Sequence, residues 1–520
     1  MRNAIMWQRK KKVFICVGLL IILLSGTMVA SVAMANSVTQ HGVTFTFDKY
    51  YQVGQFANGD YWVLGPVTIT AITPNWDGTQ HGWEVNPVIE GKSGGWAGQG
   101  FTTLAQSYNS TLRPALPYTS PGSGIVSLVK TIGGLTESSK SKILTAVVLT
   151  IVTAIPPDNG ATVFRPPYAG TSKPYYYVAD LRTDLLPTYT PMGTPPSLST
   201  VTKNFSMLRM DHKGGVLGRQ LLPENAMNDY QPDNTIQTNE GALRLMLNDS
   251  IEAKMPALIR YVQAGIDKAY IFLGMLSGQP WPDGGGHQPG HILPIAFAAT
   301  MLDMTKVKSA MESAPSGSFH ATRYIRYATD SGNYLWGQSG STETAYWNYV
   351  RGLGGNRSNA DPYRFIDGGK CGASYQIVTS QSHKGEYLAA KLMPSLQSAW
   401  PDVDFNIAKD YAVRWVNIGT RAQPDPCAPY TVGGTYQVDY GPDPANPGMC
   451  IKDTDLQYYN SRTHFACNSG QQCGRFPSQQ GTSKDGGQYR SAFVAAMWDA
   501  HKGTEPPRPL SPLNVRIIGK

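Results

Sequence analysis

Residues 143–155 read ILTAVVLTIVTAI. This apolar run is too short to cross a bilayer as a helix, which needs ~20 residues, and it fits a strand buried within a sheet. Shorter segments rich in β-branched and aromatic residues precede it, separated by turn sequences such as Asn58-Gly59-Asp60; they are 43–47, 61–64, 67–70 and 125–129. The pattern predicts a β-sandwich domain over residues 36–155.

A proline-rich stretch follows the apolar run. Residues 156–196 contain the pairs Pro156-Pro157, Pro166-Pro167 and Pro195-Pro196. Proline lacks a backbone N–H and fixes φ, so the stretch is neither a central strand nor a long helix. We expect an ordered connector between two domains at residues 156–200.

The hydrophobic period becomes helical beyond residue 239. Apolar residues recur every three or four positions between 251 and 273, and similar faces occur at 293–302, 387–396 and 405–415. Several amphipathic helices joined by long loops predict an all-α domain over residues 201–420, most simply an α/α toroid or a bundle.

The last 100 residues return to loops rich in Gly, Pro and Asp. They contain four cysteines and end in a predicted helix at 489–501. The fold class predicted for the whole chain is therefore multidomain α+β. An N-terminal β-sandwich is followed by an α/α toroid-like domain and by a disulfide-stapled, loop-rich C-terminal segment at 421–520.

The N-terminus has the layout of a bacterial secretory signal. Arg2 and the basic residues 9–12 precede an uncharged apolar stretch, residues 13–32, which ends in Ala33-Met34-Ala35. This order predicts a signal peptide over residues 1–35 with cleavage after Ala35, and hence a secreted, periplasmic or cell-surface protein. The apolar stretch is just long enough to span a bilayer, so an uncleaved anchor is the alternative. No other membrane attachment is expected.

The charge of the mature chain excludes one class of partner. The full chain has 44 Lys and Arg, 36 Asp and Glu and a net charge of +8, but five of the basic residues lie in the signal, which leaves about +3. No Lys/Arg cluster follows Lys12, so nucleic-acid binding is not expected. The 28 Tyr and 11 Trp residues offer aromatic faces that suit sugar rings, although any one of them can also fill a core. The sequence does not determine the oligomeric state.

Four of the six cysteines cluster near the C-terminus: Cys427, Cys450, Cys467 and Cys473. In an oxidising compartment such a cluster predicts two disulfides, whose connectivity stays open. A zinc site is the alternative, but the cluster contains no C-x-x-C pair. Cys371 stands alone.

The most unusual local sequence is WPDGGGHQPGH at residues 281–291. Its glycines allow close approach of the backbone to a ligand, and it presents Asp283, His287 and His291 just before a predicted helix. Pro289-Gly290 interrupts the helix that an H-E-x-x-H site needs, so no metal is expected. The alternative is an ordinary loop at the start of a helix, whose histidines bond backbone carbonyls.

A second stretch combines aromatic and polar residues between positions 324 and 351. Stacking faces, hydrogen-bond donors and a guanidinium fork together suit a polysaccharide groove, although the same residues could fill a helical core. Those singled out are Tyr334, Tyr346, Trp347 and Arg351, with Tyr375 in a third, weaker patch.

The exported layout, the Gly-Gly-His loop and the aromatic stretches together resemble the secreted bacterial polysaccharide lyases of the α/α-toroid type. Alginate-lyase-like and heparinase II/III-like proteins are examples. The resemblance covers residues 225–418; the family places its β domain after the toroid, and its Asn-His pair is Gly286-His287 here.

The resemblance implies β-elimination on a polysaccharide that contains uronic acid, with no cofactor. It implies His287 as base or carboxylate-side donor, and Tyr334 or Tyr346 as base or acid. Asn228 or Arg351 would clamp the carboxylate.

Two other functions compete with the lyase. A glycoside hydrolase on a helical toroid needs two carboxyl groups, for which the candidates are Asp283, Asp229, Glu240 and Glu343. A polysaccharide-binding envelope or matrix protein needs no catalytic group. The lyase forms a C4–C5 double bond, the hydrolase releases reducing sugar without ultraviolet absorbance, and the binding protein does neither.

Overall fold

The computed structural model divides the chain into two compact units, Met1–Ser31 and Val32–Lys520. The described residues all lie in the second unit. They are 33–89, 100–101, 103, 108–134, 142–210, 231–274, 290–314, 318–319, 384–401, 491–501 and short strands between 430 and 472.

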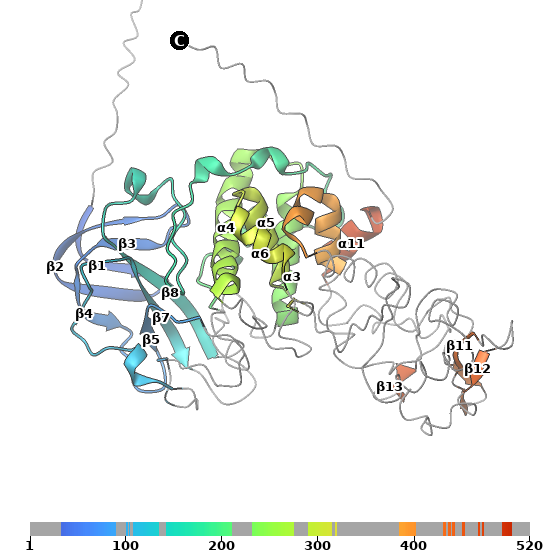
Figure 1. Ribbon diagram of the computed structural model, residues 1–520, viewed down its shortest axis with the longest axis horizontal. Helices are drawn as coiled ribbons and strands as arrows, with labels where there is room; N and C mark the ends of the chain where they lie inside the picture. The colour runs from blue at the N-terminus through green and yellow to red at the C-terminus, as the bar shows by residue number, and fades with distance from the viewer. Residues whose placement is uncertain are drawn as a thin grey trace, which may run out of the picture. The chain divides into compact units, whose positions relative to one another are not determined.

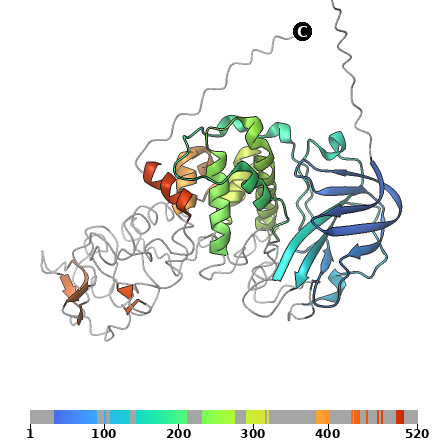
Figure 2. The same cartoon turned by 180° about the vertical axis from the view of Figure 1, so that it is seen from behind.

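The N-terminal strands form one sheet. They are β1 (Ala33–Gln40), β2 (Val43–Gln55), β3 (Tyr61–Leu64), β4 (Thr68–Thr73), β5 (Trp83–Val85), β6 (Tyr118–Thr119), β7 (Val126–Gly134) and β8 (Lys142–Val152). Their order is β5-β7-β8-β3-β2-β4-β6, with β1 paired to β2. Only β3 and β8 run parallel among these pairs, in the register Trp62↔Thr150 to Leu64↔Val152. The result is a mixed sheet curled into a half-barrel (Figures 1 and 2).

The prediction of a β-sandwich is wrong, because these strands build one sheet rather than two. Strand β8 shows the reason. Val147 and Leu149 belong to the core inside the curled sheet, whereas Ala146 and Val148 belong to a core shared with the helices. The run at 143–155 is a buried strand, as predicted, but its composition does not reveal whether a sheet or helices cover its outer face.

The helical region supplies that cover. Its elements are α1 (Leu198–Asn204), α3 (Gln231–Leu245), α4 (Ile251–Gly274), α5 (Ile292–Met301), α6 (Thr305–Glu312), a helix at 384–392, η5 (Pro394–Ala399) and α11 (Ala492–His501). The helices predicted near 251, 293, 387 and 489 are thereby confirmed, while the one at 405–415 lies outside the described residues.

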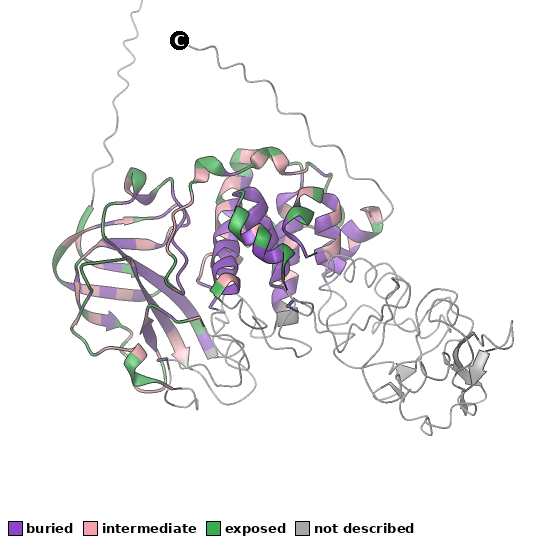
Figure 3. Ribbon diagram, in the orientation of Figure 1, coloured by how far each residue is buried: buried purple, intermediate pink, exposed green. Residues whose placement is uncertain are grey.

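The described helices do not support an α/α toroid. All 10 residues of α5 are buried (Figure 3), and α3, α4, α6 and η5 pack against it. The described helices thus gather around one central helix, and nothing in their packing indicates the repeated ring of helix pairs that makes a toroid. The apolar spacing indicates that a helix has a buried face, but not which helices surround it, and the toroid prediction is therefore wrong for this part of the chain.

The proline-rich connector is ordered and contains neither a central strand nor a long helix, as expected. It forms the short 3-10 helices η2 (Pro157–Gly160), η3 (Val178–Asp180) and η4 (Thr183–Leu185). Phe164 and Tyr168 are fully buried, so the connector is part of the core.

Arg165 in the connector is the centre of a buried ion cluster. Its Nε lies 2.6 Å from Asp60 Oδ2 in the β2–β3 turn, and its Nη1 and Nη2 lie 3.1 and 2.5 Å from the two carboxylate oxygens of Asp267 on α4. Gln40 and Asn58 donate further hydrogen bonds to Asp60. Burial opposes the charge on Arg165, but Asp267 and Asp60 raise its pKa above the ordinary value. The cluster joins sheet, connector and helix.

Three short antiparallel strand pairs lie near the C-terminus, β9 (Tyr430–Val432) with β10 (Thr435–Gln437), β11 (Asp439–Pro442) with β12 (Cys450–Lys452), and β13 (Ala466–Cys467) with β14 (Gln471–Gln472). The side chains of Cys427, Cys450, Cys467 and Cys473 are outside the described set, so the two disulfides stay a prediction. Among the described helices, none combines the length and apolar character that crossing a membrane requires.

Candidate functional site

The start of α5 lies at the end of the glycine-rich loop singled out in the sequence. Gly290 has a φ of +85°, and a Cβ at this position would lie 2.9 Å from Thr235 Cγ2 on α3. Glycine is therefore needed for the loop to approach α3 so closely. The next residue, His291, is 0% exposed.

A buried lysine lies against His291. Nζ of Lys268 on α4 is 3.0 Å from Nδ1 of His291, and Lys268 is 2% exposed. An ammonium has three donors and no acceptor, so a protonated Lys268 donates to Nδ1. The neutral imidazole then carries its hydrogen on Nε2, and the ammonium disfavours a second charge on the ring. The pair thus places an amine and an imidazole in contact at the start of α5.

A buried carboxylate binds the same loop. Oε1 of Glu386, on the helix at 384–392, accepts a hydrogen bond from the Gly290 amide at 3.1 Å. A Cβ on the neighbouring Gly385 would overlap the side-chain amide of Asn239. Residues 235 and 239 are one turn apart on α3 and share a face. Four elements therefore meet here, and Asn239, Lys268, His291 and Glu386 are named the His291 cluster.

Tyr261 supports this cluster without taking part in proton transfer. Its hydroxyl donates to the Thr238 carbonyl at 2.9 Å. Burial raises its pKa well above the ordinary value of 10.0, and the charge of Glu386 adds to this rise, whereas Arg209 lowers it. Tyr261 consequently stays protonated at physiological pH.

Of the substrate-binding and catalytic residues predicted for the lyase, the structure describes His291 alone; of the carboxyl candidates for the hydrolase, it describes Glu240. The other residues predicted for the lyase lie outside the described ranges: His287, Tyr334, Tyr346, Asn228, Asp283, Trp347, Arg351 and Tyr375. Their convergence on the His291 cluster stays a prediction.

The sequence analysis did not single out Lys268, Asn239 or Glu386. A signal for Lys268 is present in residues 264–272, AGIDKAYIF, where two adjacent charges interrupt an apolar helix. Buried charges need partners, so this pair predicts two polar contacts inside the core. The contacts are Arg165 for Asp267 and His291 for Lys268.

A metal site does not arise from the side chains that the structure describes. Within those ranges, no three His, Cys, Asp or Glu side chains are grouped so that they could hold an ion.

No protein-family model, curated protein or solved structure gives a significant match to this chain. A function can therefore be argued only from its own residues and their geometry.

Proposed function

We propose that the chain is an exported carbohydrate-active enzyme, a polysaccharide lyase that cleaves a uronic-acid-containing polymer by β-elimination. The contact between Lys268 and His291 carries the proposal, because it places a lysine amine and an imidazole together at the end of the loop that contains His287. The predicted signal peptide and the aromatic stretches support a polysaccharide substrate outside the cytoplasm.

The chemistry explains why such a pair is useful. β-Elimination transfers the C5 proton of a uronate to a base, breaks the C4–O4 bond and forms a C4–C5 double bond, while an acid delivers a proton to O4. Loss of the C5 proton moves electron density onto the adjacent carboxylate. A fixed donor and a cation next to that carboxylate stabilise the transition state, and a buried setting strengthens both interactions.

This scheme gives His291 the role of carboxylate-side donor, through Nε2–H, with Lys268 as its positioning residue. His287 and Tyr334 or Tyr346 are the proposed base and acid, and Asn228 or Arg351 would add to the carboxylate clamp. None of these steps requires a cofactor.

The test substitutes His291 by the two amide side chains. In His291→Asn the amide overlaps the position of Nδ1 and can keep the contact with Lys268, but nothing replaces Nε2–H. In His291→Gln the amide reaches toward Nε2. We expect kcat to fall at least ~10²-fold in the Asn variant and less in the Gln variant, the scale for losing a transition-state hydrogen bond. The readout is ultraviolet absorbance of the unsaturated product on alginate and other uronic-acid polymers.

The matched control is His41→Asn. His41 has a φ of +47° in the β1–β2 turn, a conformation that asparagine tolerates, and it lies on another element. Normal activity is expected for this variant. If His291→Asn melts normally and keeps full activity on a polymer that the wild type cleaves, His291 has no part in the reaction and the proposal loses its basis.

Glu240 favours a second candidate, a glycoside hydrolase. It lies on α3, accepts a hydrogen bond from Ser491 Oγ at 2.6 Å, and burial raises its pKa above the ordinary value of 4.5. A raised pKa is what a general acid needs. Release of reducing sugar without ultraviolet absorbance, lost in Glu240→Gln, would support the hydrolase over the lyase.

A further inference from the structure

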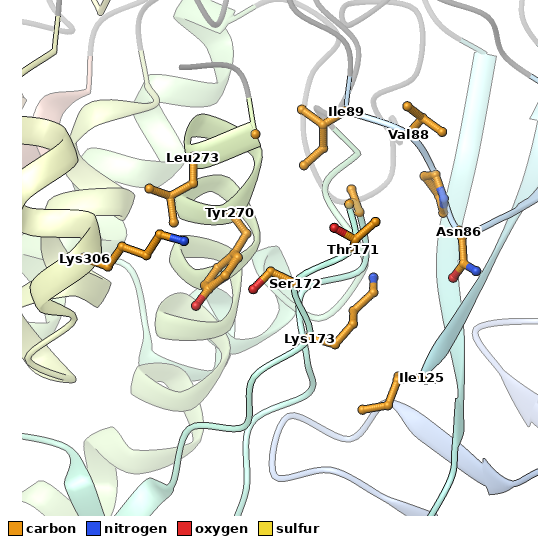
Figure 4. Close-up of a pocket in the computed structure, with 14 residues that line it drawn as sticks. Asn86, Val88, Ile89, Ile125, Thr171, Ser172, Lys173, Tyr270, Leu273 and Lys306 are labelled. Carbon is orange, nitrogen blue, oxygen red and sulfur yellow. The ribbon is translucent and has the colours of Figure 1, made fainter. Parts of the chain in front are cut away.

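A cavity of about 490 Å³ lies at the junction of sheet, connector and helices, away from the His291 cluster. Its walls come from the loop after β5, from connector residues 169–173, from the end of α4 and from α6 (Figure 4). Tyr270 lines the cavity on α4. It is two residues from Lys268 and so faces a different side of the helix. The volume lies within the range of ligand pockets, ~300–1,000 Å³.

Ile89 is the side chain that fixes the position of the loop after β5 along the cavity. Ile89 lies against both Gly170 and Gly274, where a Cβ would come within 2.8 and 2.7 Å of its Cδ1. Gly170 also donates its amide hydrogen to Pro87 O at 2.9 Å, and its φ is +73°. These contacts fix the loop after β5 against the connector and α4, so the apolar wall has a defined shape.

The charge of the lining is one-sided. Among the described residues that line the cavity there are two lysines and no carboxylate. Lys173 donates to Ser127 Oγ, Pro167 O and Tyr168 O at 3.1, 2.6 and 2.9 Å, which uses all three of its hydrogens. Lys306 on α6 is exposed, has no ion-pair partner within the described ranges, and extends toward Tyr270 (Figure 4). The ligand-facing cation is therefore Lys306.

Hydroxyl groups lie between this cation and the apolar wall. Thr171 and Ser172 line the cavity, and the hydroxyl of Tyr270 is 2.7 Å from that of Tyr176. Only one hydrogen of the tyrosine pair is used in their mutual bond, so the pair keeps one donor. Apolar side chains complete the lining, among them Val88, Ile125 and Leu273.

We propose that this cavity binds a carboxylated sugar unit, a hexuronate, with its carboxylate at Lys306, its hydroxyls at Thr171, Ser172 and Tyr270, and one apolar ring face on Leu273 and Ile89. One free ammonium matches a single carboxylate, whereas a phosphate calls for several convergent donors. The choice of a uronate among hydroxylated monoanions rests on the proposed function. The cavity would be a second subsite for the same class of polymer.

The test is calorimetric titration of the full-length protein with D-glucuronate and D-galacturonate. The matched ligand is methyl glucuronate, the methyl ester of glucuronic acid, which keeps the ring and removes the charge; inorganic phosphate is a further comparison. We expect binding of at least one uronate, with the ester and phosphate at least ~10-fold weaker. Equal binding of ester and acid, tighter binding of phosphate, or no binding of either uronate would overturn the proposal.

Variants locate the site. Lys306→Gln is expected to weaken uronate binding at the cavity about 10-fold, and Leu273→Trp, which fills the cavity, to abolish binding there. Lys308→Gln is the matched control, since Lys308 lies on the same helix but pairs with Asp303 at 2.6 Å and does not line the cavity. His291→Asn should bind uronate normally even when it is inactive, which separates this proposal from the function. Binding that survives Lys306→Gln and Leu273→Trp but is lost in His291→Asn would move the uronate to the His291 cluster.

Discussion

The buried ion cluster at Arg165 and the His291 cluster both place charged groups from α4 in the interior, but they pair them in opposite ways. Arg165 stands between two carboxylates, so its charge is neutralised and its donors are used. Among the contacts of Lys268 is one with the imidazole of His291, which offers a lone pair. Asp267, which pairs with Arg165, and Lys268 are adjacent in sequence and lie on different faces of α4.

The difference separates structural from functional burial of charge. Buried opposite charges with good geometry join the elements that carry them. Removing one partner of such a pair strongly lowers the free energy of unfolding. A contact between a lysine and an imidazole is not an ion pair, and such contacts occur at sites that stabilise charge in a reaction. Replacing Arg165 should therefore lower stability more than replacing Lys268.

The largest effect is expected for Arg165→Met. This change leaves Asp60 and Asp267 buried without their counter-charge, so the free energy of unfolding should fall by about 3–5 kcal/mol. Urea denaturation followed by circular dichroism measures it. Arg182→Met is the control, because Arg182 pairs with Asp184 at the surface, with both side chains nearly half exposed, and should change stability by less than about 1 kcal/mol. Equal losses in the two variants would remove the structural role of the Arg165 cluster.

A smaller effect, on activity rather than stability, is expected for Lys268→Met. The loss of this amine at His291 should lower kcat about 10- to 100-fold on the polymer that the enzyme cleaves, while the unfolding free energy should fall by less than in Arg165→Met. Lys254→Met is the matched control, since Lys254 is also buried on α4 but is not in the His291 cluster. A loss of several kcal/mol of stability in Lys268→Met would place this lysine with Arg165 among the structural charges.

The local structure of both regions could be predicted from the sequence, but their layers could not. The strand at 143–155 and the helix at 251–273 follow from periodicity, because each pattern reports the burial of its own side chains. Whether a strand belongs to a β-sandwich, or a helix to a toroid, depends on which elements cover those buried side chains. Val148 is equally apolar whether a second sheet or a helix covers it.

The candidate site shows the same limit. The glycine-rich loop stood out because glycines next to histidines are unusual, and His291 indeed lies at the meeting point of four elements. Lys268 and Glu386 are 118 positions apart in the sequence, and only the packing of α4, α5 and the helix at 384–392 brings them to one loop. Periodicity marks Lys268 as a charge on a buried helix, but not which residue it contacts.

The smallest predicted effect sharpens the comparison with a third cation, the partly buried Lys173, whose acceptors are all neutral. Burial, followed by repulsion from Arg165, lowers its pKa from 10.5 to about 7, although Asp267 opposes this. Between about pH 7 and 10 the unfolded chain therefore binds a proton that the folded chain has lost. The free energy of unfolding must rise with pH in this window, by at most about 1.4 kcal/mol per pH unit from this group.

Lys173→Met removes this contribution to the pH dependence. The slope of the unfolding free energy against pH should therefore be flatter in the variant than in the wild type when urea titrations at pH 7, 8 and 9 are compared. Arg165 stays charged throughout the same window because Asp267 and Asp60 raise its pKa. A lysine between the same two carboxylates should also stay charged, so an Arg165→Lys variant that folds should leave the slope unchanged. Identical slopes for wild type and Lys173→Met would mean that Lys173 keeps its proton in the folded protein across this window. Three neutral oxygens would then stabilise the ammonium of Lys173 as effectively as two carboxylates stabilise the guanidinium of Arg165.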